Sequence, residues 1–478
     1  MNDVAIVGAG PAGLTAAYIL AKNGRRPIVF EASDKVGGIA RTEIYKGFRF
    51  DIGGHRFFTK VPEVEALWRE ICGDDLLTRS RQSRIYYRGK FYSYPLKLFN
   101  ALINMGPIEA THIMLSYVKR RLKPVPVEEN FEQWVTNRFG GRLYWHFFKT
   151  YTEKVWGIPC TEIRADWAAQ RIRNLSLVKA VWNAVSGAND TASLIEKFNY
   201  PRLGPGMMWE KCRDLIQEKG GEVKMRRGVT RVFRDANRVV GIEAANFDGA
   251  PMEAERIAAD HYVSTMALAD LVAAFEPAPP AKVVEAARRL RYRDFLIVTL
   301  ILDHPDPFPD NWIYIHSPDV GVGRIQNFRA WSEEMVPDPS KASIGMEYFC
   351  HEGDGLWTMS NEALLYKAAG ELEKLGLARR ADVVDGAVIR QPKAYPVYDG
   401  GYREALGVIE AWTRGLENFQ TVGRNGLHRY NNQDHSMLAA MLAARNILGE
   451  NHDLWSINVE RSYQEEFTLA EKQRRSAA

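Results

Sequence analysis

The sequence predicts an α/β fold in which one domain is assembled from pieces that lie far apart in the chain. The first forty residues alternate strand, helix and strand, which is how a parallel sheet covered by helices begins. Apolar or alternating runs between residues 280 and 394 predict a mainly antiparallel sheet. The segment after residue 395 returns to helical spacing. The second sheet is therefore expected as an insertion in the first domain.

Composition excludes several classes of protein. The 478 residues suffice for two or three domains. The formal net charge is +4 and no basic stripe is present, so nucleic acid is not expected as a partner. The four cysteines are scattered without a CxxC pair, and no metal site is expected. We expect a cytoplasmic protein without a transmembrane segment, because neither a secretory signal nor a run of about 18 apolar residues is visible.

A glycine-rich turn joins the first strand to the first helix. In DVAIVGAGPAGLTAAYILAKNG, Gly8 permits the tight turn, Gly10 lets a phosphate approach the backbone, and Gly13 lets the helix lie close to the strand. Free amides at the helix start would face a pyrophosphate. The next strand, RPIVFE, ends in Glu31, where a ribose hydroxyl would lie. The ordered series of strand, turn, helix, strand and acid predicts a Rossmann-like dinucleotide site more strongly than a bare glycine-rich turn would.

The following residues indicate which dinucleotide is bound. EASDKVGGIARTE adds Gly37, Gly38 and Arg41, a second glycine pair that a site for nicotinamide alone does not need. This pattern resembles the FAD-binding opening of the amine oxidase superfamily, which implies that Arg41 contacts the FAD diphosphate. That superfamily includes amine oxidases, protoporphyrinogen oxidases, phytoene desaturases, UDP-galactopyranose mutases and the non-enzymatic Rab GDP-dissociation inhibitors.

Later segments resemble the other FAD-binding pieces of the superfamily. Residues 220–244 predict a strand and a hairpin around DANR, and the resemblance places Val229 beside the adenine. The C-terminal stretch TVGRNGLHRYNNQDHSM leads into a helix that starts near Gln433, whose positive end would face the flavin pyrimidine ring. From this stretch the resemblance assigns to FAD the residues Gly423, Arg424, Gln433, Asp434 and Met437.

Several stretches resemble UDP-galactopyranose mutases more than amine oxidases. GGHRFFT is similar to the mutase loop in which a histidine lies against the flavin, here His55, although a histidine satisfied within its turn is the alternative. FYSYPLK, with Tyr94, is similar to a mutase substrate segment. Residues 130–167 are similar to the mutase helical insert, with Trp156 in KVW. One departure is Asn431 and Asn432, where bacterial mutases have a tyrosine and an aspartate.

The resemblance also implies how a substrate would be held. Arg324 and Arg424 would bind a sugar-nucleotide diphosphate, because a guanidinium contacts two oxygens at once. Arg329 is the rival for the position of Arg324. Tyr395 and Tyr430 would add hydroxyl donors, although for Tyr395 a place in the turn beside Pro396 is an equal alternative. Besides Tyr94 and Trp156, the expected substrate-binding residues are therefore two tyrosines and an arginine.

The predicted function follows from this resemblance. It is a mutase-like conversion of a nucleotide-diphosphate sugar through reduced FAD, with His55, Arg324 and Arg424 in catalytic positions and NAD(P)H as a candidate reductant. One alternative is an oxidase or desaturase of the protoporphyrinogen oxidase type, which acts on a large apolar substrate. The other is a binding protein like the Rab inhibitors, without flavin. The sugar, the base and the oligomeric state stay open.

The expected domains follow the chain. FAD-binding pieces are expected at 1–90, 201–279 and 395–478, a helical insert at 91–200, and an antiparallel-sheet substrate domain at 280–394. The substrate would lie between these parts and the flavin ring. Within the insert, the apolar segment 98–122 ends in VKRRLK. That pattern fits either a solvated helix end packed on the core or a helix on a membrane surface.

Overall fold

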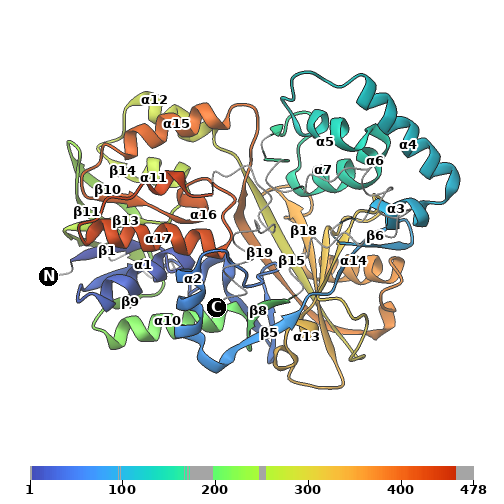
Figure 1. Cartoon of the computed structure of the whole chain (residues 1–478). Coiled ribbons are helices and arrows are strands. Elements are labelled where there is room, and N and C mark those ends of the chain that lie inside the picture. The colour runs from blue at the N-terminus through green and yellow to red at the C-terminus, as the bar shows by residue number, and fades with distance from the viewer. Residues whose placement is uncertain are drawn as a thin grey trace.

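The computed structural model describes residues 3–94, 96, 98–165, 167–168, 172, 197–246 and 254–458. The part of the expected helical insert at 173–196 and Pro95 of the YPLK stretch lie outside the described residues. Figure 1 shows a helix-covered sheet at one end of the molecule and a second sheet with the helical insert at the other. The predicted α/β fold, with one parallel and one mainly antiparallel sheet, is confirmed.

A parallel sheet of five strands organises the first end. Every neighbouring pair in it is parallel. Its order is β20 (Phe419–Thr421), β13 (His261–Ser264), β1 (Val4–Val7), β2 (Pro27–Phe30) and β9 (Glu222–Lys224). The strands come from three distant parts of the chain, as a discontinuous domain requires. β1 and β2 consist of buried residues because α1 packs on them and residues of the four-stranded sheet share their core.

Helices from both ends of the chain cover this sheet. α1 (Pro11–Lys22) packs against α17 (Gln433–Ile447) and α10 (Pro205–Glu218). The predicted start of the last helix at Gln433 is confirmed. Further helices around this end are α2 (Pro62–Cys72), α11 (Leu268–Ala274), α12 (Ala281–Arg289), α15 (Tyr402–Thr413) and the single turn α16 (Gly423–Gly426), with 3-10 turns at Gly38–Ala40, Gly73–Asp75 and Leu454–Ser456.

A four-stranded sheet lies beside the parallel one. The hairpin predicted around DANR is present, because β10 (Arg227–Asp235) pairs antiparallel with β11 (Arg238–Asn246). β12 (Glu255–Ile257) and β14 (Phe275–Glu276) complete this sheet. Two short strand pairs connect the ends of the molecule, namely β3 (Thr42–Tyr45) with β4 (Phe48–Asp51) and β5 (Leu76–Ser80) with β8 (Lys197–Pro201).

The second end is built on a seven-stranded sheet. Its order is β19 (Val383–Pro396), β15 (Tyr292–Leu302), β18 (Ala342–Cys350), β17 (Arg324–Asn327), β16 (Trp312–Ile315), β6 (Ser83–Tyr87) and β7 (Lys90–Ser93), and all pairs are antiparallel except β16 with β6. Side chains of β15 alternate between two cores: Phe295 and Ile297 face one, and Leu296 and Val298 face the other. Burial on both faces explains why its sequence is a continuous apolar run.

One face of this sheet carries α14 (Asn361–Lys374), and the other joins the core of the helical insert. The insert contains α3 (Leu98–Met105), α4 (Pro107–Leu122), α5 (Phe131–Phe139), α6 (Gly141–Leu143), a π-helical turn at Tyr144–Lys149, and α7 (Thr150–Trp156). The remaining turns are α13 (Phe328–Trp331) and the 3-10 turns Glu333–Met335 and Arg380–Asp382. The expected domain boundaries stay predictions. The hairpin of β6 and β7, whose residues lie before residue 94, extends the large sheet.

Close packing of α1 on β1 gives the first prediction. A methyl group on Gly13 would lie 1.8 Å from the Gly8 carbonyl oxygen, so Gly13→Ala must push the helix off the strand. We expect the apparent melting temperature and FAD retention to fall, with a stability loss of about 2 kcal/mol or more. Gly407→Ala in α15, where a methyl group meets no neighbour within 4 Å, is the matched control and should stabilise the protein slightly. Equal melting temperatures for the two variants would contradict this packing.

Candidate functional site

A cavity of about 960 Å³ lies where the parallel sheet, the seven-stranded sheet and the helical insert meet. The predicted site residues that line it are Gly8, Gly10, Glu31, Gly38, His55, Tyr94, Trp156, Arg324, Tyr395, Gly423, Arg424, Tyr430, Gln433 and Asp434. The predicted residues that do not line it are Gly13, Gly37, Arg41, Val229 and Met437. Segments from the beginning, middle and end of the chain therefore converge on one space.

The first glycine-rich turn forms one wall of the cavity. Gly8 has φ +95°, and a methyl group there would lie 2.1 Å from Thr265 Oγ1. Gly10 precedes α1, and no side chain caps this helix start. A methyl group on Gly38 would lie 3.2 Å from Gly10 Cα, so the two glycine turns pack backbone against backbone. Exposed amides at an uncapped helix start suit a bound pyrophosphate.

Glu31 stands at the end of β2 and faces the same turn. Its carboxylate accepts hydrogen bonds from the Ala9 amide (2.7 Å) and from the amide and hydroxyl of Ser33 (2.9 and 2.8 Å). A carboxylate offers about four acceptor positions. Three positions hold the loop in shape and one is left over; its contact with a ribose hydroxyl stays a prediction.

Arg41 lies behind the second glycine pair and outside the cavity lining. Its guanidinium donates to Glu43 (2.7 Å), to the Gly38 carbonyl (2.9 Å) and to Gln391 (2.8 Å). Gly37, which precedes the 3-10 turn beside Arg41, has a left-handed backbone with φ +102°. These contacts tie the turn to β19 of the large sheet. A diphosphate contact from Arg41 stays a prediction.

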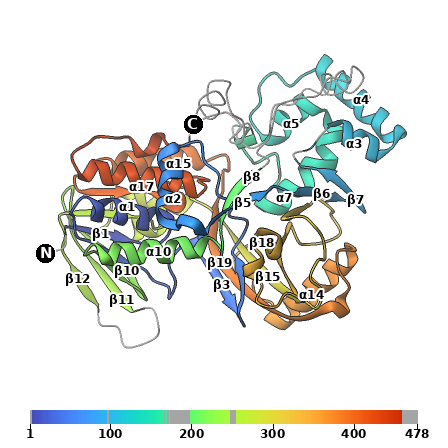
Figure 2. The same cartoon turned by 60° about the horizontal axis from the view of Figure 1, so that its bottom comes forward.

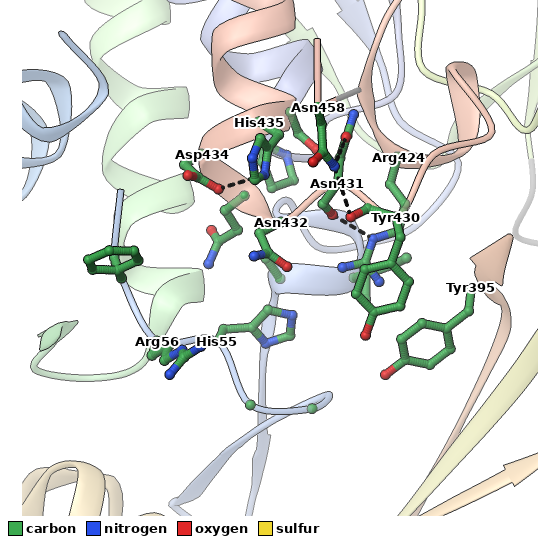
Figure 3. Close-up of a pocket in the computed structure, with 18 of the residues that line it drawn as sticks. His55, Arg56, Tyr395, Arg424, Tyr430, Asn431, Asn432, Asp434, His435 and Asn458 are labelled. Carbon is green, nitrogen blue, oxygen red and sulfur yellow. Dashed lines mark hydrogen bonds and ion pairs between the residues drawn. The ribbon is translucent and has the colours of Figure 1, made fainter. Parts of the chain in front are cut away.

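The GGHRFFT loop presents His55 to the cavity, as Figure 3 shows. Burial, together with the charges of Arg424 and Arg324, lowers the pKa of His55 to about 3. Nδ1 of His55 is buried and has no hydrogen-bond partner in the described part of the chain. Gly54 lies directly against the Arg324 guanidinium, because a methyl group there would come within 3.7 Å of Cζ. The imidazole is thus neutral, and its Nδ1 lacks a hydrogen-bond partner among the described residues.

Arg424 brings a positive charge into the cavity. Its guanidinium donates to the carbonyls of Asn431 (2.9 Å) and Ala394 (3.0 Å), and among the described residues no carboxylate pairs with it. It lies over the rings of Tyr430 (5.0 Å) and Tyr395 (5.4 Å), which are stacked on each other at 5.4 Å (Figure 3). Burial and the neighbouring Tyr430 raise the pKa of Tyr395, so its hydroxyl stays protonated and can donate.

Arg324 differs from Arg424 in having a carboxylate partner. It donates through Nε (2.8 Å) and Nη2 (2.7 Å) to Glu347, which is fully buried on the neighbouring strand. Burial raises the pKa of Glu347 while Arg324 acts against that rise. The pair is therefore close to neutral as a unit. Arg329, the rival arginine, donates to the carbonyls of Pro339 and Lys341 and does not line the cavity.

The N-terminus of α17 forms another part of the cavity wall. No side-chain hydrogen bond caps this helix. Gln433 accepts from the Trp209 indole (3.1 Å), and its own Nε2 is buried without a partner in the described structure. Asp434 contacts His435 at 3.1 Å. Met437 is instead fully buried, with its sulfur against the Trp68 indole (3.1 Å). The helix meets the cavity through its first turn and Leu438.

Aromatic residues line the end of the cavity toward the helical insert. Tyr94 lies 4.3 Å from Tyr314, and Tyr151 stacks on His316 at 4.4 Å. Trp156 packs 5.8 Å from Tyr430 and 4.9 Å from Trp167. Tyr314 and Tyr151 were not predicted from the sequence. The stretch WIYI, which carries Tyr314, alternates as a strand does, and only this alternation could have indicated that Tyr314 faces the cavity. Other cavity residues without a predicted role are Arg56, Lys60, Trp312, His316, Asn431, Asn432, His435 and Asn458.

The comparisons with known proteins agree with this geometry. A model of the family described as "Flavin containing amine oxidoreductase" matches residues 11–454. The chain belongs to this family. Its cofactor is FAD. The cavity fits that cofactor, because it offers two uncapped helix starts, a close glycine approach, and unpartnered polar atoms on His55 and Gln433 within the described structure.

Individual relatives match over short stretches. A 15-cis-phytoene desaturase of Narcissus pseudonarcissus is 39% identical over 85 residues, which is 18% of this chain and 15% of the relative. A putrescine oxidase of Kocuria rosea is 37% identical over 103 residues, or 21% of each chain. Protoporphyrinogen oxidase 2 of Arabidopsis thaliana is 42% identical over 79 residues, or 16% of this chain and 15% of the relative. The chain thus matches about a fifth or less of these relatives' length.

Solved structures match over nearly the whole chain. A reduced UDP-galactopyranose mutase has a TM-score of 0.83 at 20% identity and covers 97% of this chain and 100% of its own. A putative protoporphyrinogen oxidase from Exiguobacterium sp. has a TM-score of 0.70 at 16% identity, with 94% and 99% covered. At these identities the likeness shows the fold alone.

Among the described residues, no helix has the length and apolar character to cross a membrane, and no cluster of metal-ligating side chains is present.

The neutral state of His55 gives a prediction about pH. Its pKa in the folded protein lies below the ordinary 6.5, so unfolding takes up a proton between those values and acid lowers the stability that burial confers. We expect the His55 Cε1–H resonance, assigned by its loss in His55→Gln, to keep the neutral shift from pH 8 down to about pH 4. A midpoint near the ordinary value would show that the imidazole can become charged and would contradict this environment.

Proposed function

We propose that the protein is a mutase-like flavoenzyme that acts on a sugar joined to a nucleotide diphosphate. The observation that carries this proposal is the charge of Arg424. It lies beside the expected flavin position without a carboxylate partner in the described chain, on a platform of two tyrosines. An uncompensated cation in a partly dry cavity calls for an anionic ligand. A diphosphate answers that requirement, and an uncharged substrate does not.

Under this proposal, each residue that lines the cavity has a separate role toward the substrate or the flavin. Arg424 would bind the diphosphate oxygens and stabilise the charge that the leaving group gains. Tyr395, protonated, and Tyr430 would donate to oxygens of the sugar or the phosphate. His55, neutral, would pack against the flavin and accept or donate one hydrogen bond without transferring a net charge. Arg324, already paired with Glu347, would orient the ligand through its remaining Nη1.

Bound FAD, when reduced, supplies the nucleophile that such an isomerisation needs. The uncapped start of α17 and Arg424 both favour negative charge nearby, which stabilises the reduced state. The aromatic wall formed by the insert would exclude water from the sugar. The resemblance in fold to a reduced UDP-galactopyranose mutase supports the same proposal.

One observation favours a second candidate, an oxidase or desaturase with an apolar substrate. Much of the cavity toward the insert is lined by Phe131, Phe139, Phe147, Phe148 and Trp167. A substrate with a large apolar group would bury surface there. Consumption of oxygen with such a substrate, and none of the expected isomerisation, would favour this candidate. A purified protein without flavin would instead favour a binding protein.

The stoichiometry of reductant separates the two enzymatic candidates. If the proposal holds, the anaerobically reduced protein converts a nucleotide sugar to an isomer of equal mass, and many product molecules form for each equivalent of dithionite or NAD(P)H. The sugar is rearranged and not oxidised, so electrons are not consumed. Mass spectrometry and the flavin absorbance follow both quantities. One reductant consumed per product would identify an oxidoreductase and exclude the mutase.

The two candidate arginines offer a matched pair of variants. Arg324→Lys should weaken binding of UDP or a UDP-sugar about tenfold to a hundredfold, because lysine cannot make the forked contact and must still satisfy Glu347. Arg329→Lys should bind like the parent protein, since Arg329 holds backbone carbonyls outside the cavity. Titration followed by flavin fluorescence measures both. The reverse order of effects would move the substrate site to Arg329.

A further inference from the structure

Exposed apolar side chains gather on the helical insert. Of the twelve large apolar residues that are exposed in the described part of the chain, seven lie between residues 103 and 145. On α4, Ile108 is 76% exposed, Leu115 63% and Leu122 77%. Val118 and, on α3, Ile103 are exposed beside them. We call these five residues the α4 face. Scattered exposed apolar residues are ordinary, but four on one helix and a fifth on the helix before it are not.

Packing fixes which side of α4 faces outward. Ile113 and Tyr117 are buried against the rest of the insert. At 3.6 residues per turn, Ile108, Leu115 and Leu122 lie on the opposite side of the helix. Gly140, with φ +79°, lies close to the backbone of α4: a methyl group there would lie 2.7 Å from the Tyr117 nitrogen. Figures 1 and 2 place α4 at the outer edge of the molecule.

Positive charge adjoins the α4 face. Lys119, Arg120, Arg121 and Lys123 lie within one and a half turns at the end of α4, and no carboxylate among the described residues forms an ion pair with them. Glu109, the acid in the first turn, is already bound by Arg142 (2.5 Å) and His146 (2.8 Å). Cations at a helix C-terminus compensate its dipole, which explains one or two of them but not four beside an apolar row.

A tryptophan of the same insert is also exposed. Trp145 is 55% exposed and follows α6, whose Arg142 amide donates to Ser116 of α4 (3.1 Å). An apolar helix face, adjoining lysine and arginine, and an exposed tryptophan are the features of helices that lie in the plane of a membrane interface. A second protein surface would cover the apolar row equally well, but it would not by itself account for four cations without ion pairs in the described structure. An anionic bilayer satisfies both features.

We propose that the α4 face binds the surface of an anionic lipid bilayer, with its apolar side chains in the headgroup region and Lys119, Arg121 and Lys123 on lipid phosphates. The helix lies in the interface and does not cross it, since α4 has 16 residues. The same insert supplies aromatic residues to the cavity, so binding would hold the site beside the membrane. The proposal is independent of which reaction the flavin supports.

The test uses the full chain loaded with FAD and vesicles of phosphatidylcholine, with or without phosphatidylglycerol. We expect flotation with the anionic vesicles, weaker at high salt. The double change Leu115→Asp and Leu122→Asp should lower the partition coefficient at least about a hundredfold. Each of Lys119→Gln, Arg121→Gln and Lys123→Gln should lower it about fivefold. Flavin content and melting temperature show that each variant is folded.

A control variant comes from the opposite edge of the large sheet. α3 packs against β7, whereas Val384 lies on β19 at the far edge and is 53% exposed. Val384→Asp should bind vesicles like the parent protein. The proposal is wrong if the parent protein does not bind anionic vesicles, if neutral vesicles bind it equally at all salt concentrations, or if both kinds of aspartate variant bind alike. If the α4 double variant converts a dimer into a monomer and vesicles are never bound, the face is an interface between copies of the chain.

Discussion

The close approach of α1 to β1 determines where the site can form. With Gly13 against the Gly8 carbonyl, the helix start points along the carboxyl edge of the parallel sheet. Every strand of that sheet runs in the same direction, so the segments after β1, β2, β13 and β20 emerge at that edge. Glu31, Thr265 and Gly423 follow three of these strands. Residues about four hundred positions apart therefore meet without any long loop.

The charges of the cavity form a second level of organisation. Two helix starts and Arg424 make the region around the expected flavin positive. His55 stays neutral there because burial and the two arginines oppose its protonation, which lowers its pKa. Adding a proton would place a further positive charge beside the two guanidinium groups. The site thus favours ligands that bring negative charge, which applies to a diphosphate and to reduced flavin alike.

Local periodicity made much of the fold predictable. Gly8, Gly10 and the acid Glu31 stand at a spacing typical of one strand–turn–helix–strand geometry, and the start of α17 at Gln433 followed from apolar spacing. The partner of Arg324 could not be predicted, because Glu347 opposes it through the register of β17 on β18. The last helix shows a different limit: a motif locates a helix but not which of its side chains face the cavity, and Met437 does not.

The contrast between Arg324 and Arg424 bears on the chemistry. If both arginines held a diphosphate as charged groups, burying Glu347 beside one of them would cancel much of its attraction. The pair of Arg324 and Glu347 is better suited to orienting a ligand than to attracting it. Glu347 fixes two guanidinium nitrogens and leaves the third beside Gly54 at the cavity. Under the proposed function, Arg424 would supply the charge and Arg324 would set the direction of the contact. An apolar substrate would need neither the charge of Arg424 nor the orienting contact of Arg324. With such a substrate, the charge of Arg424 would act only on the reduced flavin.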